Sequence, residues 1–563
     1  MRQEMNRRDA IALGITSVAA VSVCGDAEAA VSADAASLVV RRHDARLQEG
    51  LQKQVRDVQS RWCGSIPDQW GLHHCHRAAG LLRDAATAYF HPQSRYHAQQ
   101  ELVERMKLAA AFLVRSQNDS GNIDLVTTNF NSPPDTGFVV HRVATAAKLA
   151  RLNGDKGVFS LLEEFLRRAG LGLIHGGIHT PNHRWVVCAA LAQIHDLLPD
   201  ARYIKRIDQW LSEGIDIDEE GQFTERSTAG YNSVVDSALV VIAHKLKRAE
   251  LLDAVRKNLD AMAYLLHPNG EVVTEISSRQ DLNTRGTMSG YWFVLRYMAL
   301  RDGEGLYASM VKPLEPESIE LSRLMEYPEL NKRLPAPTAV PDDYERAYPL
   351  SGITRIRRGR TSATILHKGQ SRWICLRQGE AVVNAIRLAS AFFGKGQFIP
   401  AVYERRGDGF YFRQELTGRY FQPIDDPSLL PVVNAGWSRL KMKRKTTEIC
   451  RMVYEARLQE IDQGFEVFIV AQGTGNVPLA VEINVREGGE LTGVTGAPHS
   501  AGAFLLEEGF AEYRMGSDGI RFGPGRCEHA YVQVRGAEGK LSGPSVYLTG
   551  YTPFQHRLAF EML

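Results

Sequence analysis

The sequence predicts a helical N-terminal domain followed by an antiparallel β-sandwich. Three observations support this fold class. Apolar residues recur at three-to-four spacing from about residue 40 to residue 311, the spacing changes to two after residue 345, and a proline-punctuated stretch at 334–341 separates the two patterns. The chain has 563 residues, of which 44% are hydrophobic and 23% charged. This composition is typical of a soluble globular protein with two or more domains.

The helical pattern is clearest at residues 98–114, 139–152, 185–198, 234–246, 252–266 and 291–300. Short segments rich in Gly, Pro, Asn or Asp separate these runs, so we expect roughly ten helices joined as hairpins. Such hairpins stack in a line or close into a ring. No fixed repeat period is evident in the sequence, which disfavours a regular solenoid.

The second part of the chain has strand-like segments at 363–367, 372–376, 465–470 and 479–485. Residues 368–370 and 462–464 are predicted hairpin turns, and residues 407–409 a further turn. No helical break is expected in this part, and an uninterrupted series of strands of this length favours an antiparallel sandwich.

The N-terminus predicts export. Arg7 and Arg8 precede a short run of apolar and small residues, and Ala27-Glu28-Ala29 fits a signal cleavage site. We therefore expect a signal peptide of the twin-arginine type at 1–29, a helical domain at 30–325, a linker at 326–345 and the sandwich at 346–563. A bacterial periplasmic or extracellular location follows. A lipoprotein attached at Cys24 is a weaker alternative, because Val23 is a poor lipobox residue.

Six cysteines remain after the signal, and disulfides or buried free thiols are both open for them, with Cys63 and Cys75 the nearest pair. The formal net charge of +2 gives no reason to expect nucleic acid or a membrane surface as a partner. A local basic groove for an acidic polymer is compatible with it. No segment beyond the signal is long and apolar enough to span a membrane, and the oligomeric state is not specified.

Two polar stretches at the starts of predicted helices carry the chemistry. They are 181–185, with Asn182 and His183, and 225–231, with Glu225 and Tyr231. An amide or imidazole near a phenol suits removal of a carbon-bound proton next to a carboxylate, because the first group stabilises developing negative charge and the second moves the proton.

With these residues in this order, the chain resembles heparinase II/III-type polysaccharide lyases, a group that includes alginate lyases. Residues 221–226 resemble the lead-in to the catalytic Tyr of that group. The resemblance implies an incomplete α/α toroid before the β-sandwich, and cleavage of a uronate-containing glycan by β-elimination. It implies that Asn182 and His183 neutralise the uronate carboxylate and that Tyr231 acts as base and acid. An acidic polysaccharide or oligosaccharide is the expected partner.

One departure from that group concerns metal. Its members often carry a second catalytic His and zinc ligands in the first sandwich strands, but residues 380–400 contain no His here. We therefore expect no metal and no other cofactor. A second catalytic group would then be Tyr403, Tyr411 or Arg387, or would lie in the helical domain. The run His73-His74-Cys75-His76 is not expected to bind metal, because adjacent helical residues point in different directions.

Substrate-binding candidates lie around these motifs. They are Asn129 and Asp135 in the polar loop 128–138, Arg142 with the neighbouring His141, His179, Glu225, Arg226, Arg279, Gln280 and Tyr403. Arg279 suits bidentate binding of a carboxylate. Arg226 and Arg184 are the expected cations that would lower the pKa of Tyr231 from its ordinary value near 10.

Each assignment has a structural alternative. Asn182 is also a suitable helix cap, His183 a structural histidine, Tyr231 a packed aromatic and Glu225 an ion-pair partner. Asp135 or Thr136 suits an N-cap, and Arg279 a brace to an Asp. Two other functions stay open: a glycoside hydrolase using two of Asp135, Glu225 and Asp281, and a non-catalytic glycan-binding protein. The sequence contains no GxSxG, Walker A, HExxH or Rossmann motif.

Overall fold

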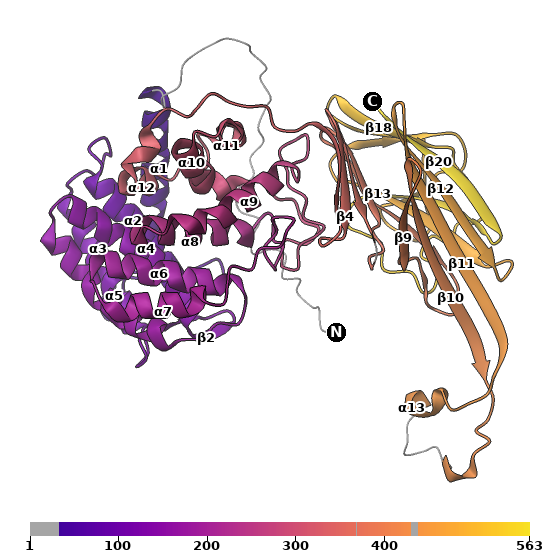
Figure 1. Ribbon diagram of the computed structural model, residues 1–563, viewed down its shortest axis with the longest axis horizontal. Helices are drawn as coiled ribbons and strands as arrows, with labels where there is room; N and C mark the ends of the chain where they lie inside the picture. The colour runs from indigo at the N-terminus through magenta and orange to yellow at the C-terminus, as the bar shows by residue number, and fades with distance from the viewer. Residues whose placement is uncertain (1–32, 368, 430–436) are drawn as a thin grey trace.

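The computed structural model describes residues 33–367, 369–429 and 437–563. The expected signal peptide, Cys24 and Lys368 of one predicted turn lie outside these residues. The helical domain and the β-sandwich lie side by side, as Figure 1 shows. Within the described part of the chain, no helix combines the length and the hydropathy that a membrane crossing requires.

The helical domain contains twelve of the described α-helices. They are α1 (Ala33–Lys53), α2 (Cys75–Phe90), α3 (Gln100–Arg115), α4 (Pro133–Leu152), α5 (Lys156–His175), α6 (Asn182–Leu197), α7 (Ala201–Leu211), α8 (Tyr231–Leu246), α9 (Leu252–Ala263), α10 (Trp292–Asp302), α11 (Gly305–Val311) and α12 (Leu321–Glu326). A two-stranded ribbon of β1 (Ile123–Leu125) and β2 (Asn129–Ser132) precedes α4.

The helices form an incomplete ring of two layers. Helices α2, α4, α6 and α8 pack against one another in that order, and α3, α5, α7 and α9 each pack against the preceding helix of this inner layer. At the two ends of the series, α12 packs against α2 and α4, and α10 packs against α8. Residues 182–194 of α6 are buried on every side, as expected for an apolar helix with neighbours all round.

A turn recurs in the connections of this ring. At 68–72, 118–122 and 218–222, the backbone N–H of the first residue donates to the carbonyl oxygen of the fifth. The side-chain Oδ1 of the first residue accepts a hydrogen bond from the backbone N–H of the fifth. The fourth residue is a glycine at positive φ; at Gly221 (φ +81°) a Cβ would lie 2.4 Å from the carbonyl oxygen of Lys257. These turns recur about 50 residues apart or at twice that interval, so the ring has a structural repeat that the sequence pattern did not indicate.

The sandwich consists of two sheets. Its strands are β3 (Asp343–Tyr348), β4 (Ile353–Arg358), β5 (Thr361–Leu366), β6 (Ile374–Gln378), β7 (Ala381–Ser390), β8 (Gly396–Gln397), β9 (Val402–Arg406), β10 (Gly409–Phe421), β11 (Thr446–Ile461), β12 (Gly464–Gly473), β13 (Pro478–Val485), β14 (Glu490–Thr492), β15 (Thr495–Gly496), β16 (Ala503–Leu505), β17 (Ala511–Met515), β18 (Asp518–Gly523), β19 (Ser545–Tyr551) and β20 (Phe554–Met562).

One sheet has the order β14-β17-β18-β20-β12-β11-β10-β9, and the other β15-β16-β19-β13-β7-β6-β5-β4-β3, with β8 beside β7. All the described pairs are antiparallel except β16 with β19. Alternate residues of the strands form the buried core between the sheets, with Trp373, Phe412 and Tyr454 among the largest side chains. The predicted fold class, a helical toroid followed by an antiparallel sandwich, is confirmed.

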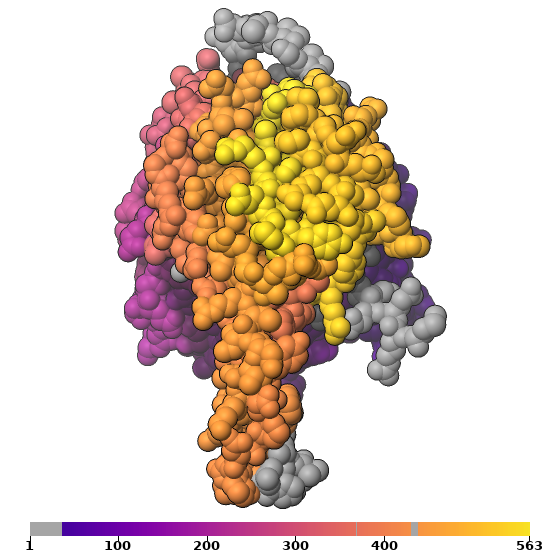
Figure 2. All heavy atoms as spheres, turned by 90° about the vertical axis from the view of Figure 1, so that its right-hand side faces the viewer, coloured from indigo at the N-terminus to yellow at the C-terminus, as the bar shows by residue number. Residues whose placement is uncertain are grey.

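The expectation of an unbroken series of strands is wrong at one place. Helix α13 (Trp437–Lys441) interrupts the chain between β10 and β11. These two strands are long and continue past the rest of the sandwich as an arm that carries α13, which Figures 1 and 2 both show.

Buried charges join the two domains. Glu271 of the helical domain accepts hydrogen bonds from Arg377 at 2.5 Å and Arg486 at 2.6 Å, both in the sandwich. Burial alone would raise the pKa of Glu271, but the two guanidinium groups outweigh it and lower the pKa to about 2. Arg355, fully buried on β4, donates to the carbonyl oxygen of Leu266 at 3.3 Å. The segment between α9 and α10 is therefore held by the sandwich.

Candidate active site

Three separate segments meet at the N-terminal ends of α6 and α8. Asn182 begins α6, and its Nδ2 donates to Oε2 of Glu225 at 2.6 Å. The other carboxylate oxygen of Glu225 lies 3.4 Å from Nη1 of Arg279. The guanidinium carbon of Arg279 lies 4.7 Å from the ring centroid of Tyr231, which begins α8. Three successive contacts therefore connect Asn182 to Tyr231.

The turn before α8 has its own supports. The side chain of Ser227 accepts a hydrogen bond from the backbone N–H of Tyr231 at 2.9 Å and donates to Asp281 at 2.9 Å. Asp281 also accepts from Ser277 and from the backbone N–H of Ala229. Because Asp281 lies two residues after Arg279, these bonds position the Arg279 segment beside Tyr231.

Glu225 is buried at the centre of this cluster. Burial raises its pKa, the hydrogen bond from Asn182 and the charge of Arg279 lower it, and Asp216 and Asp281 raise it; the net shift is upward. A carboxyl group with a raised pKa keeps its proton more readily, which is a feature of many functional sites.

A second group of side chains lies next to this cluster. The ring of His183 meets the exposed ring of His179 edge-to-face at 4.7 Å and the ring of Phe138 at 6.3 Å. Burial, followed by the charge of His179, lowers the pKa of His183 to about 4, although Asp135 raises it. His183 is therefore a neutral imidazole at neutral pH.

Asp135 links His183 to the polar loop. Its carboxylate accepts from Asn129 at 3.0 Å and from Ser132 at 2.5 Å, and lies 3.6 Å from Nε2 of His76. Burial and the charge of Arg142 lower the pKa of His76 to about 4. His76 was not among the predicted site residues. The one sequence signal for it was a His near the start of a helix, here α2.

Several buried polar atoms in this region have no hydrogen-bond partner. They are Oδ1 of Asn182, Nδ1 of His183, Oε1 of Glu225, Nε of Arg279 and Nε2 of His76. Native structures leave few buried polar atoms unpaired, so such a group in one place is typical of a site that a ligand completes. Tyr231 and Arg279 are half-buried, and His179 and Gln280 are exposed. The cluster therefore extends from the interior to solvent.

Other predicted residues lie elsewhere. Arg226 and Arg184 were expected beside Tyr231, and this is wrong: Arg226 pairs with Asp218 at 2.9 Å, and Arg184 pairs with Asp216 at 2.8 Å. The cation that contacts the phenol ring is Arg279. Arg142 lies one turn beyond Phe138 on α4; burial and the charge of Arg83 lower its pKa to about 10.

The sandwich candidates make contacts within the sandwich. The ring of Tyr403 stacks on His367 at 3.9 Å, and its hydroxyl is 3.0 Å from Oγ1 of Thr354. Tyr411 donates to Glu455 at 2.8 Å. Arg387 is bound by Glu482 and by Glu538. Its charge is already neutralised, which argues against a catalytic role.

The structural alternatives have mixed outcomes. Asn182 is not a cap, because it is the first helical residue and its side chain bonds to Glu225. Ser132, not Asp135 or Thr136, caps α4. Glu225 is an ion-pair partner of Arg279, so the brace is to Glu rather than to Asp.

The histidine run diverges as expected. The rings of His73, His74 and His76 contact Ser65, Asp68 and Asp135 respectively. Among the described residues, no group of three or more His, Cys, Asp or Glu side chains is arranged to hold a metal ion. The six described cysteines are all free thiols.

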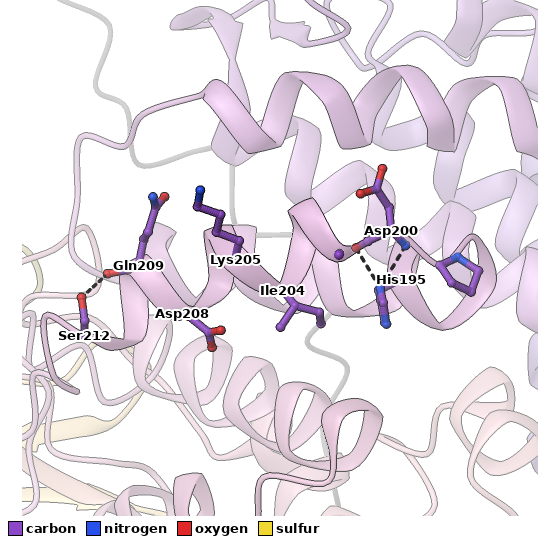
Figure 3. Close-up of a pocket in the computed structure, with 9 residues that line it drawn as sticks. His195, Asp200, Ile204, Lys205, Asp208, Gln209 and Ser212 are labelled. Carbon is purple, nitrogen blue, oxygen red and sulfur yellow. Dashed lines mark hydrogen bonds between the residues drawn. The ribbon is translucent and has the colours of Figure 1, made fainter.

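One groove lies away from this cluster. It has a volume of about 810 Å³, and His195, Asp200, Lys205 and Asp208 are among its lining residues. Figure 3 shows these residues along α7. None of the predicted site residues lines the groove. His195 is bound to the backbone of Asp200, and none of the buried polar atoms without a partner belongs to a lining residue of this groove. We therefore place the candidate active site at the Tyr231 cluster, where the chemistry is concentrated.

Comparisons with known proteins concern the fold. No protein-family model and no curated protein sequence matches the chain. The solved structure of the chondroitin AC lyase of Streptomyces coelicolor A3 in complex with chondroitin sulphate matches it with a TM-score of 0.58 at 12% identity, over 95% of this chain and 80% of that chain. A chondroitinase AC lyase solved as oligosaccharide complexes matches with a TM-score of 0.51 at 11% identity, over 94% of this chain and 82% of that chain.

A xanthan lyase from Paenibacillus gives a TM-score of 0.57 at 9% identity, and the match covers 95% of this chain and 57% of the xanthan lyase. This chain therefore spans little more than half the length of that enzyme. Likeness at such identities shows the fold alone. The chain has the fold of these polysaccharide lyases, an α/α toroid followed by an antiparallel β-sandwich.

Proposed function

We propose that the protein is a polysaccharide lyase that cleaves a uronate-containing glycan by β-elimination and leaves an unsaturated uronate. We further propose that it is a divergent relative of heparinase II/III-type lyases and is exported from a bacterial cell. The observation that carries the activity is the cluster in which the guanidinium of Arg279 lies over the half-buried ring of Tyr231, surrounded by buried polar atoms without partners. The fold shared with polysaccharide lyases supports the class.

In this proposal Tyr231, as phenolate, removes the proton at C5 of the uronate. The electron pair of the broken C–H bond forms the C4–C5 double bond, the bond from C4 to the glycosidic oxygen breaks, and Tyr231 returns the proton to that oxygen. One group serves as base and then as acid, which suits elimination from one face of the sugar. The guanidinium of Arg279 lies over the ring, 4.7 Å from its centroid.

The negative charge that develops beside C5 must be stabilised on the uronate carboxylate. The sequence assigned this role to Asn182 and His183. In the structure Nδ2 of Asn182 already donates to Glu225 and Thr180, and His183 has a pKa of about 4 and carries no charge at neutral pH. We therefore assign the carboxylate to Arg279, whose Nε has no partner and whose guanidinium is a permanent charge.

The remaining residues of the cluster then hold Tyr231 and Arg279 in place. Asn182 fixes Glu225, and Glu225 fixes Arg279 over the phenol. His183, Asn129 and Gln280 are proposed to contact the sugar, with the unpaired Nδ1 of His183 available for a hydroxyl.

The test uses the mature protein with a panel of acidic polysaccharides, read by the ultraviolet absorbance of the unsaturated product and by reducing ends. A lyase gives both signals. Reducing ends without absorbance would indicate the hydrolase alternative, and neither signal with retained binding would indicate a glycan-binding protein.

The variant Tyr231→Phe is expected to lower kcat by about 10²–10⁴-fold, the usual contribution of a proton-transfer group, while substrate binding is retained. Tyr551→Phe is the matched control, because Tyr551 is a partly exposed phenol on the sandwich. Equal activity of both variants would refute the assignment of Tyr231.

A further inference from the structure

The end of the β10–β11 arm concentrates positive charge. We call residues 437–451, which comprise α13 and the start of β11, the basic arm. The segment holds six basic residues and one acidic residue, Glu448, so its net charge is +5, whereas the whole chain has a net charge of +2. The basic residues are Arg439, Lys441, Lys443, Arg444, Lys445 and Arg451.

Few of these charges are neutralised within the protein. Lys445 pairs with Asp425 at 2.7 Å, and Arg451 lies 3.8 Å from Glu415. Among the described residues, Arg439, Lys441 and Lys443 form no ion pair. Like charges held close together repel one another, and the ion pairs at Lys445 and Arg451 offset only part of this repulsion. A binding partner that carries negative charge would offset it.

Aromatic rings lie among the cations. Nζ of Lys441 is 4.8 Å from the ring centroid of Phe421, and the guanidinium of Arg444 is 4.5 Å from that of Trp437. The two rings meet edge-to-face at 6.5 Å, and Trp437 is 54% exposed. The exposed ring of Trp437 offers a flat apolar face beside these cations.

The shape of the arm matches a linear ligand. Figures 1 and 2 show it projecting from the sandwich. Arg439, Lys443 and Lys445 are exposed, and Lys441 and Arg444 are half-buried. The basic arm contains none of the residues of the Tyr231 cluster. A polymer that is longer than the cluster can therefore contact both, and two linked contacts give higher affinity than either alone.

We propose that the basic arm is a second binding site for the acidic polysaccharide, separate from the Tyr231 cluster. This inference rests on the proposed function for the identity of the polymer. Carboxylate or sulfate groups of the chain bind Arg439, Lys441, Lys443 and Arg444, and a sugar face packs on Trp437. A membrane surface fits less well, because α13 has five residues and forms no amphipathic helix long enough to lie in a lipid interface.

The experiment measures binding in the Tyr231→Phe background, so that no probe is cleaved. The probes are chondroitin sulfate, polygalacturonate, neutral dextran and vesicles with anionic lipid. The arm variant is Arg439→Gln, Lys441→Gln, Lys443→Gln and Arg444→Gln together. The matched control neutralises four exposed lysines of the helical domain and the linker after it: Lys156→Gln, Lys257→Gln, Lys312→Gln and Lys332→Gln.

The arm variant is expected to bind one or both acidic polymers about tenfold more weakly, with a shallower dependence on salt, while the control changes less than about twofold. Equal weakening in both variants would overturn the proposal, as would binding to vesicles but to neither acidic polymer. The milder pair Arg439→Gln and Lys443→Gln, which leaves both cation–ring contacts intact, should show a smaller loss of the same kind if the larger variant is poorly folded.

The proposed function is tested independently of the arm. One outcome is polymer binding that depends on the arm while the protein with Tyr231 intact forms no unsaturated product. That result would support the arm site and refute the lyase assignment. If the protein is a lyase and its arm variant binds and cleaves long polymers as the unmodified protein does, the lyase assignment stands and the arm site is removed. For the active enzyme, the arm variant should raise KM for long polymers and leave cleavage of a short oligosaccharide unchanged.

Discussion

The buried carboxylate at the domain interface gives a prediction whose size follows from the structure. Glu271 is 5% exposed and lies between Arg377 and Arg486, whose side chains are each 8% exposed. The variant Glu271→Gln keeps the shape of the side chain and removes its charge. It leaves Arg377 without its ion-pair partner and Arg486 with only the more distant Glu380, at 3.8 Å, which is the costly way to disrupt a buried ion pair.

The expected loss is about 3 kcal/mol or more. The pKa of Glu271 falls from 4.5 to about 2, and each pKa unit corresponds to about 1.4 kcal/mol of interaction between the charged form and the folded protein. Because the folded-state pKa is depressed, this stabilisation is complete above pH 4.5 and is lost as the pH falls towards 2. Removal of one partner from a buried pair typically costs about 3–5 kcal/mol, which agrees.

Unfolding by guanidinium chloride, followed by tryptophan fluorescence, measures the free energy of unfolding at pH 7 and at pH 4. The control is Glu561→Gln, which removes a surface partner of Arg521; its side chain is 32% exposed, and the expected loss is below about 1 kcal/mol. If Glu271→Gln unfolds within about 1 kcal/mol of the unmodified protein at pH 7, the interface charges do not stabilise the domain contact as argued here.

Three further predictions concern single residues. Neither carboxyl oxygen of the fully buried Asp236 has a partner, and burial raises its pKa well above 3.8. Above pH 3.8 the Asp236 carboxyl ionises in the unfolded chain but stays protonated in the folded protein, so the free energy of unfolding falls as the pH rises. Thermal melts should therefore show Asp236→Asn gaining stability over the unmodified protein from pH 5 to pH 8. His183, with a pKa of about 4, should give the pH–rate profile an acid limb near pH 4, and His183→Gln should abolish it. A limb near pH 6.5 that is present in the unmodified protein and absent from His183→Gln would contradict this. Arg279→Lys should lower kcat at least about tenfold with the fold unchanged by circular dichroism, because an ammonium group cannot both bind Glu225 and cover the ring of Tyr231.

Periodicity predicted the two-domain fold, because it is a local signal. The apolar runs of α4, α6 and α8 were evident, and the strand β12 alternates clearly. Helices α5 and α7 lie within the predicted helical region but were not among its clearest runs. The first contains Gly170, which meets the ring of Tyr203 on α7, and Gly172, which meets the turn at Ser120 and Asn122. The second has only two buried residues, so its pattern is mostly polar.

The site was predicted in part. Tyr231 and Asn182 were expected at helix starts, and both lie there. The choice of cation was not predictable, because Arg184, Arg226 and Arg279 are equivalent as sequence symbols. Tertiary packing brings Asp216 and Asp218 to the first two and leaves Arg279 for the phenol. The repeated turn was hidden because its first residue is Asp or Asn and only the fourth position requires glycine.

The contacts of the α9–α10 segment have a consequence for protein engineering. Three residues of this segment are bound by the sandwich. Leu266 is bound by Arg355, Glu271 by Arg377 and Arg486, and Glu275 by Gln370. Arg279 lies four residues beyond the last of these anchors. The two halves are therefore not interchangeable modules: a chimera that joins this toroid to a foreign sandwich would need the matching arginines transplanted with it.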